Sequence, residues 1–199
     1  MYAVAGNLRT VTYNWVYSKD DQHEQWIRIK NVTYPANYNF PHGDVAIVFV
    51  EKPFQLNSYV QTITYASKHV DYYYTCGKCL VSGFGMINSK VLSDSLQVAQ
   101  LQLVPQRRCL HYLRDNYIYV CTSTRLTATG KGDSGGPLVC TNTGDPREVE
   151  GKGILVGILA GYDVKNKVNI FARVSAYHKY MDRNCARYLN GVTIFDFVA

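Results

Sequence analysis

The residues with the clearest chemical content are the hexapeptide Gly132-Asp133-Ser134-Gly135-Gly136-Pro137. Glycines on both sides of Ser134 allow a tight, strained backbone turn that exposes the hydroxyl group as a nucleophile. The unobstructed N–H of Gly132, together with that of Ser134, can point at one substrate oxygen and form an oxyanion hole. Asp133 adds a charge that must be paired wherever it is buried. The alternative is an ordinary glycine-rich turn, which the β-like run ending in Cys140 disfavours.

The elements that must position this hexapeptide are mainly β-strands. Runs that alternate with period two, or that are continuously apolar, recur along the chain. They lie at residues 2–5, 11–17, 26–29, 44–50, 79–82, 96–104, 117–122, 137–141, 154–159 and 169–174. The run 44–50 begins with Asp44 and is otherwise apolar, which is typical of a strand buried on both faces.

Helical patterns are short and few. Residues 106–113 are predicted as a short helix, and residues 64–78, rich in Tyr, Lys and Gly, as a connecting segment. After Ser175, a potential N-cap, apolar and aromatic residues recur at helical spacing up to Tyr188. The sequence therefore predicts a C-terminal helix over residues 175–189, followed by a tail over residues 190–199.

Composition limits the class of protein. The 199 residues suggest one domain, or two small halves that share one function. With 47% hydrophobic and 18% charged residues, the chain can bury a sizeable core. The net charge of +6 is scattered rather than gathered in a basic stripe, so we predict no nucleic-acid partner. The longest near-apolar run, residues 154–160, is too short to span a bilayer, so we predict no membrane association.

The cysteines and the N-terminus give conflicting indications of the compartment. Six cysteines in a β-rich chain favour a disulfide-bonded, secreted protein. Residues 1–6, however, have neither the basic start nor the apolar stretch of a signal peptide. The chain is either cytosolic with reduced cysteines or the C-terminal part of a longer secreted protein, and we favour the second. The triplet Asn31-Val32-Thr33 is compatible with glycosylation at Asn31 on that route.

The motifs, taken together, resemble those of the chymotrypsin-like (trypsin-fold) serine proteases. Residues 132–137 resemble the family's nucleophile motif and match it at every position. Residues 44–47 (Asp-Val-Ala-Ile) resemble its triad-aspartate segment. Residues 79–85 resemble Cys-x-Val-Ser-Gly-Trp-Gly, with Phe84 replacing Trp, and residues 171–175 resemble Tyr-Thr-Arg-Val-Ser. Asp44 and Ser134 are 90 residues apart, close to the family's spacing of about 93.

The resemblance covers about residues 2–186 and implies an all-β fold. This fold has two six-stranded antiparallel β-barrels, the first incomplete here, and a C-terminal α-helix. Residues 1–63 would be a remnant of the first barrel, residues 64–78 a linker and residues 79–174 the second barrel. All of these would belong to one partial protease domain over residues 1–186.

The resemblance also assigns roles. Ser134 would be the nucleophile, Asp44 would orient a histidine, and the N–H groups of Gly132 and Ser134 would bind the oxyanion. Asp133 would pair with the amine freed by activation, but the Ile-Val-Gly-Gly start that supplies this amine does not occur in the sequence. We therefore expect a loose oxyanion hole, which adds to the loss of the triad histidine in predicting negligible peptidase activity from this chain.

The triad histidine is the missing part, because the family's Thr-Ala-Ala-His-Cys motif does not occur in the sequence. His42 is two residues from Asp44 on the same face of one strand, so it cannot easily reach both Asp44 and Ser134. His23-Glu24 lacks the second histidine of a zinc-protease motif. The remaining histidines are interpreted as surface or packing residues: His69, His111 and His178. We predict no metal and no cofactor.

Six cysteines allow 15 pairings, and the resemblance implies two of them, Cys79–Cys140 and Cys109–Cys121. Cys76 and Cys185 remain. Either they form a disulfide with each other, or Cys76 forms one with a pro-segment that is missing from this chain. A reduced protein with unrelated thiols is the alternative. The family's pocket disulfide does not occur, because Gly130 stands where its first cysteine would be.

Four residues match the family's specificity pocket: Ala128, Ala160, Tyr162 and Asn169. Ala128, at the base, offers no acid for a Lys or Arg side chain. Among the four pocket residues, Tyr162 has the nearest acid in sequence, Asp163. Tyr162 and Asn169 put bulk where the family has glycine, so the pocket is predicted to be small, blocked or reshaped. The resemblance therefore implies cleavage after apolar or small side chains, or no cleavage.

Two functions remain open. The first is a secreted serine endopeptidase that hydrolyses peptide bonds through an acyl-enzyme, represented here by an incomplete copy. The second is a non-catalytic serine protease homologue that binds partners in a proteolytic cascade. The intact Asp44, Asp133 and Ser134 favour the first, and the unusual pocket favours the second. The partners would be protein or peptide substrates, protease inhibitors or cascade proteins. A full-length transcript that carries or lacks the histidine motif would separate the two.

Overall fold

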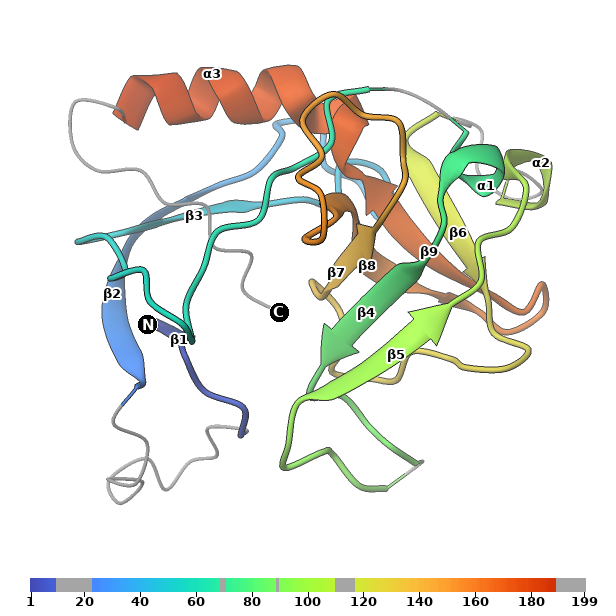
Figure 1. Cartoon of the computed structure of the whole chain (residues 1–199), viewed down its shortest axis with the longest axis horizontal. Helices are drawn as coiled ribbons and strands as arrows, with labels where there is room; N and C mark the ends of the chain where they lie inside the picture. The colour runs from blue at the N-terminus through green and yellow to red at the C-terminus, as the bar shows by residue number, and fades with distance from the viewer. Residues whose placement is uncertain (10–22, 69–70, 89, 110–116, 189–199) are drawn as a thin grey trace.

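The computed structural model describes residues 1–9, 23–68, 71–88, 90–109 and 117–188 (Figure 1). The strands are β1 (Tyr2–Ala5), β2 (Gln25–Thr33), β3 (Ile47–Val50), β4 (Cys79–Gly83), β5 (Gln97–Leu101), β6 (Tyr119–Ser123), β7 (Pro137–Cys140), β8 (Ile154–Asp163) and β9 (Val168–Arg173). The helices are α1 (Tyr72–Thr75), α2 (Gln106–Cys109) and α3 (His178–Tyr188), the last preceded by a 3-10 turn, η1 (Val174–Tyr177). Within the described ranges, no helix has both the length and the apolar character needed to cross a membrane.

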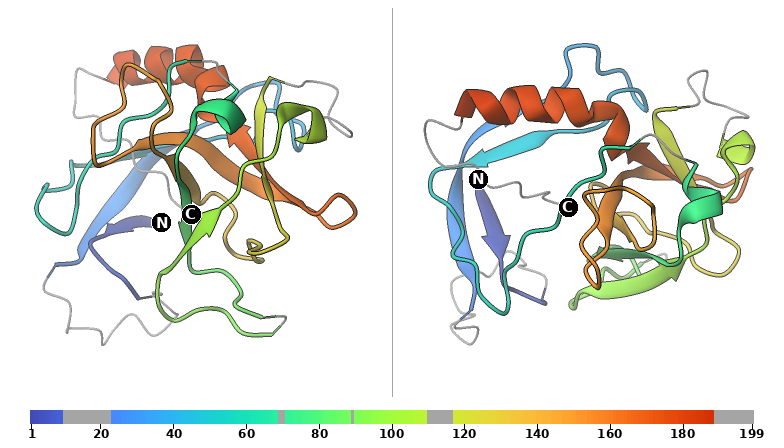
Figure 2. Two further views of the ribbon diagram at one scale, coloured as in Figure 1. Left: turned by 45° about the vertical axis from the view of Figure 1, so that its right-hand side comes forward. Right: turned by 45° about the horizontal axis from the view of Figure 1, so that its top comes forward.

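Six strands form one antiparallel sheet in the order β5-β4-β7-β8-β9-β6, which curls on itself (Figures 1 and 2). The chain beyond β5 reaches β6, because Ser123 N donates to the Gln102 carbonyl at 2.8 Å and Val104 N to the Cys121 carbonyl at 3.0 Å. Inward-facing side chains, among them Leu138 and Phe171, form an apolar cluster that fills the interior of the curled sheet. The mostly β fold that the sequence predicts is confirmed.

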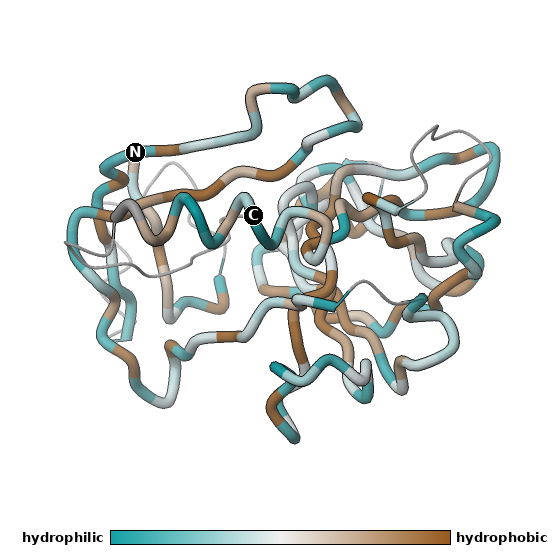
Figure 3. The backbone as a smooth tube through the Cα atoms, turned by 90° about the horizontal axis from the view of Figure 1, so that it is seen from above, coloured by the Kyte–Doolittle hydropathy of each residue, from teal (hydrophilic) through white to brown (hydrophobic). Residues whose placement is uncertain are grey.

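The N-terminal half forms a three-stranded sheet in the order β1-β2-β3. A second apolar cluster joins the two halves, because Ile47 and Phe49 of β3 belong with Leu155 of β8 and Met181 of α3 to one buried group. Figure 3 shows apolar segments recurring along both halves of the tube, which lie side by side in this view. This shared cluster fixes the segment before β3, which carries Asp44, relative to the loop before β7, which carries Ser134.

The C-terminal helix begins later than predicted. Ser175 lies inside η1 instead of capping a helix, and Arg173 before this turn makes no side-chain cap. Val174 is fully buried, so the chain turns inward directly after β9 and α3 begins at His178. The predicted last residue of the helix, Leu189, and the predicted tail lie outside the described residues.

The strand predicted at 44–50 is also shorter than expected. Only Ile47–Val50 pairs as β3, because Gly43 has φ +71° and Val45 N donates to its carbonyl at 2.8 Å. Asp44 therefore lies in a turn before the strand. The strand predicted at 11–17 lies outside the described residues, as does the second half of the helix predicted at 106–113.

Candidate active site

Ser134 lies on the loop that enters β7, and its side chain is exposed. Gly132 and Gly135 have φ +99° and +86°, a region that favours glycine because it has no Cβ. The loop is bound to β8, since Gly135 N donates to the Leu159 carbonyl at 2.8 Å and Leu159 N to the Gly136 carbonyl at 2.9 Å. The sequence therefore forms a defined turn that presents Ser134 to solvent beside β8.

The backbone of the same turn provides the candidate oxyanion hole. Asp133 N donates to the Gly130 carbonyl at 3.2 Å, and Gly136 N donates to the Asp133 carbonyl at 2.9 Å. Among the described residues, the N–H groups of Gly132 and Ser134 donate to no protein acceptor. Both are therefore available to an oxygen outside the chain, which is what an oxyanion hole requires. The assignment of Gly132 and Ser134 to this hole stays a prediction.

Asp133 turns away from Ser134 and is held by two backbone amides. Its Oδ1 accepts from Gly85 N at 2.7 Å and its Oδ2 accepts from Gly130 N at 2.7 Å. A Cβ on Gly85 would lie 2.4 Å from the Asp133 Cγ atom, so a side chain at position 85 would displace the carboxylate. The sequence predicts a loose oxyanion hole because no amine pairs with Asp133. In the structure, two backbone amides give each carboxylate oxygen a donor, and the looseness of the hole stays a prediction.

Asp44 is half-buried before β3. Tyr177 of η1 fixes the preceding turn, because its hydroxyl accepts from Gly43 N at 3.1 Å. Burial raises the pKa of Asp44 above its ordinary value. The cause is desolvation of the charged form, which disfavours ionisation.

Asp44 and Ser134 line one cavity of about 510 Å³. The strand β8 contributes Ile158 and Leu159 to its wall, and the segment before Asp44 contributes Tyr34 and Tyr38. A carboxylate and a hydroxyl that are 90 residues apart in the sequence therefore face a common space. A nucleophile and an orienting acid must face a common space if a base is to lie between them, and the roles of Ser134 and Asp44 stay predictions.

None of the described histidines lines this cavity. His42 lies with its Nε2 atom 3.0 Å from Asn37 Nδ2, and His23 stacks on Tyr59 with ring centroids 3.7 Å apart. His178 of α3 contacts Arg147 at 2.8 Å and Asp182 at 3.1 Å. His23 and His178 thus make local contacts, as expected of surface or packing residues, and His42 lines no cavity with Asp44 and Ser134; His69 and His111 lie outside the described residues.

The four predicted pocket residues divide into two groups. Ala160 and Tyr162 line a second cavity of about 410 Å³ beside Phe40 and Pro41. Ala128 is exposed and Asn169 is fully buried, and neither lines this cavity or the one that holds Ser134. The role of these four residues in substrate binding stays a prediction.

Asn169 can be buried because both its amide oxygen and its amide nitrogen are hydrogen-bonded within the barrel wall. Its Oδ1 accepts from Thr129 N at 3.2 Å and from Thr129 Oγ1 at 2.9 Å, and its Nδ2 donates to Thr122 Oγ1 at 3.0 Å. The amide therefore lies against Thr129, the residue that follows Ala128, and takes up space that a glycine at position 169 would leave.

Asp163 lines the 410 Å³ cavity, although its carboxylate is engaged locally. Asn166 N donates to its Oδ1 at 3.0 Å and Asn166 Nδ2 to its Oδ2 at 2.6 Å. These hydrogen bonds, the Asn166 backbone first, lower the pKa of Asp163. The carboxylate thus stabilises the turn between β8 and β9.

The disulfides Cys79–Cys140 and Cys109–Cys121 are present, which confirms the two implied pairings. Cys76 and Cys185 are free thiols, so the alternative in which they pair with each other is wrong. Burial raises the pKa of Cys76 to about 12 and that of Cys185 to about 11. Asn31, the candidate glycosylation site, is half-buried in β2 opposite Phe49, and its modification stays a prediction.

Sequence reasoning missed two parts of the site. The first is the aromatic rim, in which Tyr34, Tyr38 and Phe40 are exposed beside the two cavities. The concentration of aromatic residues just before Asp44 was a usable signal. The second is the amide pair of Gly85 and Gly130 around Asp133, for which the sequence holds no signal beyond two isolated glycines.

Comparison with known proteins agrees with this geometry. The sequence model of the Trypsin family matches residues 4–181. Coagulation factor IX of Cavia porcellus is 31% identical over 154 residues, covering 73% of this chain and 52% of the relative. Mast cell protease 8 of Mus musculus is 36% identical over 102 residues, covering 49% of this chain and 41% of the relative. The chain thus spans about half the length of these curated relatives, or less.

Solved structures show the same fold. Neuropsin, a serine protease expressed in the limbic system of mouse brain, superposes with a TM-score of 0.72 at 20% identity, covering 92% of this chain and 78% of that one. A mutant of human heparin binding protein superposes with a TM-score of 0.70 at 19% identity, covering 96% and 78%.

The paired β-sheets and the serine-bearing turn between them define a protein of the chymotrypsin-like class. Because one family model matches most of its length, the chain belongs to the Trypsin family of serine proteases.

Proposed function

We propose that this chain forms part of a secreted serine endopeptidase in which Ser134 is the nucleophile and Asp44 orients the general base. The observation that carries the proposal is the shared cavity of about 510 Å³, which Asp44 and Ser134 both line. The free N–H groups of Gly132 and Ser134 support it, because they lie in the same turn as the nucleophile. Coagulation factor IX and urokinase-type plasminogen activator are among the relatives, which supports a protein substrate and a secreted location.

The chemistry follows from these groups. The Ser134 hydroxyl attacks the peptide carbonyl while an imidazole in the cavity removes its proton. The carbonyl oxygen becomes an oxyanion, which the N–H groups of Gly132 and Ser134 stabilise. The imidazolium then protonates the leaving amine, and water hydrolyses the acyl-enzyme by the same route. Asp44 accepts from the imidazole and holds it in the productive tautomer.

A second candidate function is that of a non-catalytic homologue that binds substrates, inhibitors or other proteins of a proteolytic cascade. The buried Asn169 amide favours it, because it is bonded to Thr129, next to Ala128, and takes up room that the family's glycine would leave for a substrate side chain. The exposed Tyr34, Tyr38 and Phe40 then offer a surface for a partner.

Labelling with a fluorophosphonate, with and without added imidazole, tests the proposal. Without a base we expect very slow labelling of the 199-residue chain, because loss of the histidine from another triad protease costs roughly 10⁶ in turnover. Added imidazole enters the cavity and replaces the base, so labelling of Ser134 accelerates at least about tenfold.

Two variants make the labelling test specific. Ser134→Ala should abolish labelling, and Asp44→Asn should remove the acceleration by imidazole while leaving the basal rate unchanged. Equal acceleration in wild type and Asp44→Asn would show that Asp44 does not orient a base. No acceleration in wild type would favour the non-catalytic homologue. Rapid labelling without imidazole would contradict the expected inactivity of this chain.

A further inference from the structure

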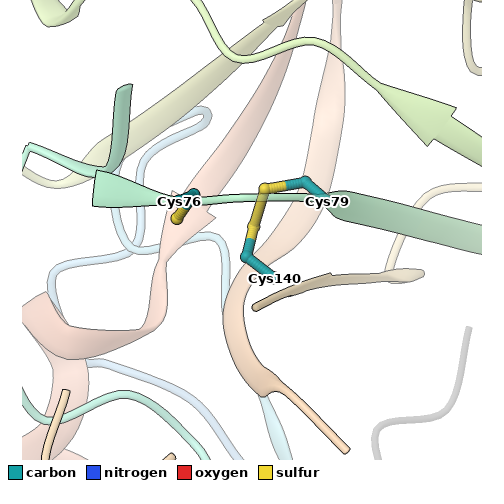
Figure 4. A group of neighbouring side chains, drawn as sticks. All are labelled: Cys76, Cys79 and Cys140. Carbon is teal, nitrogen blue, oxygen red and sulfur yellow. A yellow bond between two sulfur atoms is a disulfide. The ribbon is translucent and has the colours of Figure 1, made fainter. Parts of the chain in front are cut away.

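Three sulfur atoms lie together where β4 begins and β7 ends (Figure 4). Cys76 follows α1, Cys79 begins β4 and Cys140 ends β7. The Sγ atoms of all three lie within 4.8 Å of one another, and Cys79 and Cys140 form a disulfide. A free thiol is therefore within reach of both sulfurs of an existing disulfide.

The backbone holds Cys76 in this place. Gly77 N donates to the Thr141 carbonyl at 2.8 Å, and Thr141 N donates to the Lys78 carbonyl at 2.9 Å. These bonds extend the pairing of β4 with β7 toward Cys76. The Cys76 N–H donates to the Tyr72 carbonyl at 2.9 Å, which closes the turn after α1. The closeness of the three sulfurs thus follows from strand pairing.

The cluster is also accessible from outside. Cys76 and Cys79 line a surface cavity of about 760 Å³ together with Lys78 and Gln100. Cys76 is half-buried and packs against the same apolar cluster as Cys79 and Cys140. Hydroxide ion can therefore reach the Cys76 thiol from this cavity without unfolding of the barrel, whereas Cys79 and Cys140 are buried and are reached by Cys76 from within the fold.

We propose that Cys76, Cys79 and Cys140 form a thiol–disulfide exchange site in which Cys76 displaces Cys79 from Cys140. The Cys76 thiolate attacks the Cys140 sulfur, a Cys76–Cys140 bond forms, and the Cys79–Cys140 bond breaks. Cys79 leaves as a thiolate and takes up a proton. One disulfide and one thiol are present before and after, so the step needs no oxidant or reductant.

Chain topology selects Cys140 as the sulfur that is attacked. The existing disulfide spans 61 residues, and a Cys76–Cys140 bond would span 64. The two bonds constrain the unfolded chain almost equally, whereas a Cys76–Cys79 bond would close a loop of only three residues. Attack at Cys140 therefore keeps β7, the strand that follows the Ser134 loop, in a disulfide crosslink. Its partner changes from Cys79 of β4 to Cys76 of the connecting segment.

Charge and burial around Cys76 set the pH dependence of the exchange. Burial raises the pKa of Cys76 to about 12; the nearby Glu148 also raises it, while a hydrogen bond with Thr75 and the charge of Arg173 lower it. The Tyr72 phenol, whose pKa is also raised, and Lys78 lie beside it. Since only the thiolate attacks, the exchange rate rises about tenfold per pH unit below that pKa.

Counting thiols in serine variants tests the proposal. The wild-type chain has two free thiols, Cys76 and Cys185. If Cys76 replaces Cys79, the Cys79→Ser variant refolded in a glutathione buffer should contain one free thiol, Cys185, and a Cys76–Cys140 peptide. The matched control, Cys76→Ser with Cys79→Ser, should contain two free thiols, Cys140 and Cys185. Three free thiols in monomeric Cys79→Ser would overturn the proposal.

The wild-type chain provides an independent measurement should the variants fail to fold. Samples held at about pH 7 and about pH 10 without added thiol are quenched in acid and mapped under non-reducing conditions. A Cys76–Cys140 peptide should accumulate faster at the higher pH, at a rate independent of protein concentration, with free Cys79 in equal amount. Persistence of the Cys79–Cys140 peptide alone at both pH values would contradict the exchange. A dominant Cys76–Cys79 peptide would refute the choice of Cys140.

Discussion

Asn169 connects three parts of the barrel wall through one amide. It lies on β9 opposite Thr122 of β6 and Tyr162 of β8. Its oxygen accepts from the backbone and side chain of Thr129, and its nitrogen donates to Thr122. Because Asn169 and Thr122 are fully buried, solvent does not compete for these bonds in the folded protein. Asn169, whose place in a substrate pocket stays a prediction, thus stabilises the barrel.

We predict that Asn169→Ala lowers the free energy of unfolding by about 1–3 kcal/mol, because buried donors on Thr129 and a buried hydroxyl on Thr122 lose their partner. Urea denaturation measures the change. Asn39→Ala is the matched control, since the Asn39 side chain is exposed and only its backbone pairs, with His42. Equal denaturation midpoints for the two variants would show that the amide network contributes nothing.

At the scale of elements, the loop between β7 and β8 is fastened to the segment that connects the two sheets. Asp145 is buried, and its carboxylate oxygens accept from Ser67 N at 2.7 Å, Lys68 N at 2.6 Å and Arg147 N at 2.9 Å. Burial tends to raise the pKa of Asp145, but the hydrogen bonds from Lys68, Arg147 and Ser67 outweigh it and hold the pKa below its ordinary value.

We predict that Asp145→Asn destabilises the fold by about 1–3 kcal/mol near neutral pH, because an amide NH₂ must then face a backbone N–H. A carboxyl group with a lowered folded-state pKa stabilises the fold above its unfolded pKa of about 4. That stabilisation is lost as pH falls through the folded-state pKa. Urea denaturation at about pH 7 and about pH 3 should therefore show a difference from wild type that shrinks in acid. Asp94→Asn, at an exposed position, is the control, and a difference that grows in acid would contradict the assignment.

The elements that the sequence could predict are those with a local cause. The turn around Ser134 follows from its glycines, and most strands follow from period-two patterns in the sequence. The start of α3 could not be predicted from Ser175, because burial of Val174 decides where the chain turns.

The parts of the candidate site that depend on tertiary contacts also escaped prediction. The two amides around Asp133 come from residues 48 positions before it and 3 before it. The approach of Cys76 to Cys140 depends on strand pairing between distant segments. No periodic pattern encodes either contact.

At the scale of the whole molecule, the two halves create the candidate site at their junction. β3 and β8 share an apolar cluster, and this packing brings the segments that carry Asp44 and Ser134 to one cavity. The walls around the site are mostly apolar and aromatic. The acid nearest to the expected pocket, Asp163, has both carboxylate oxygens bonded to Asn166. The site as a whole therefore offers little to a cationic side chain.

We predict that peptidyl phosphonates with apolar or small side chains beside the phosphorus label Ser134 faster than those with Lys or Arg, when imidazole is supplied. A cationic side chain loses its hydration on binding, and neither Ala128 nor Asn169 offers a carboxylate to compensate. A preference of at least about tenfold corresponds to about 1.4 kcal/mol.

Ala128→Asp alone should gain little for Lys or Arg, because the Asn169 amide, bonded to Thr129 next to residue 128, takes up space that a glycine at position 169 would leave. Ala128→Asp combined with Asn169→Gly opens that space beside a new carboxylate, so it should shift the preference toward basic side chains. Fastest labelling of the wild-type chain by the Arg or Lys probe would show instead that Asp163 serves as the counter-charge.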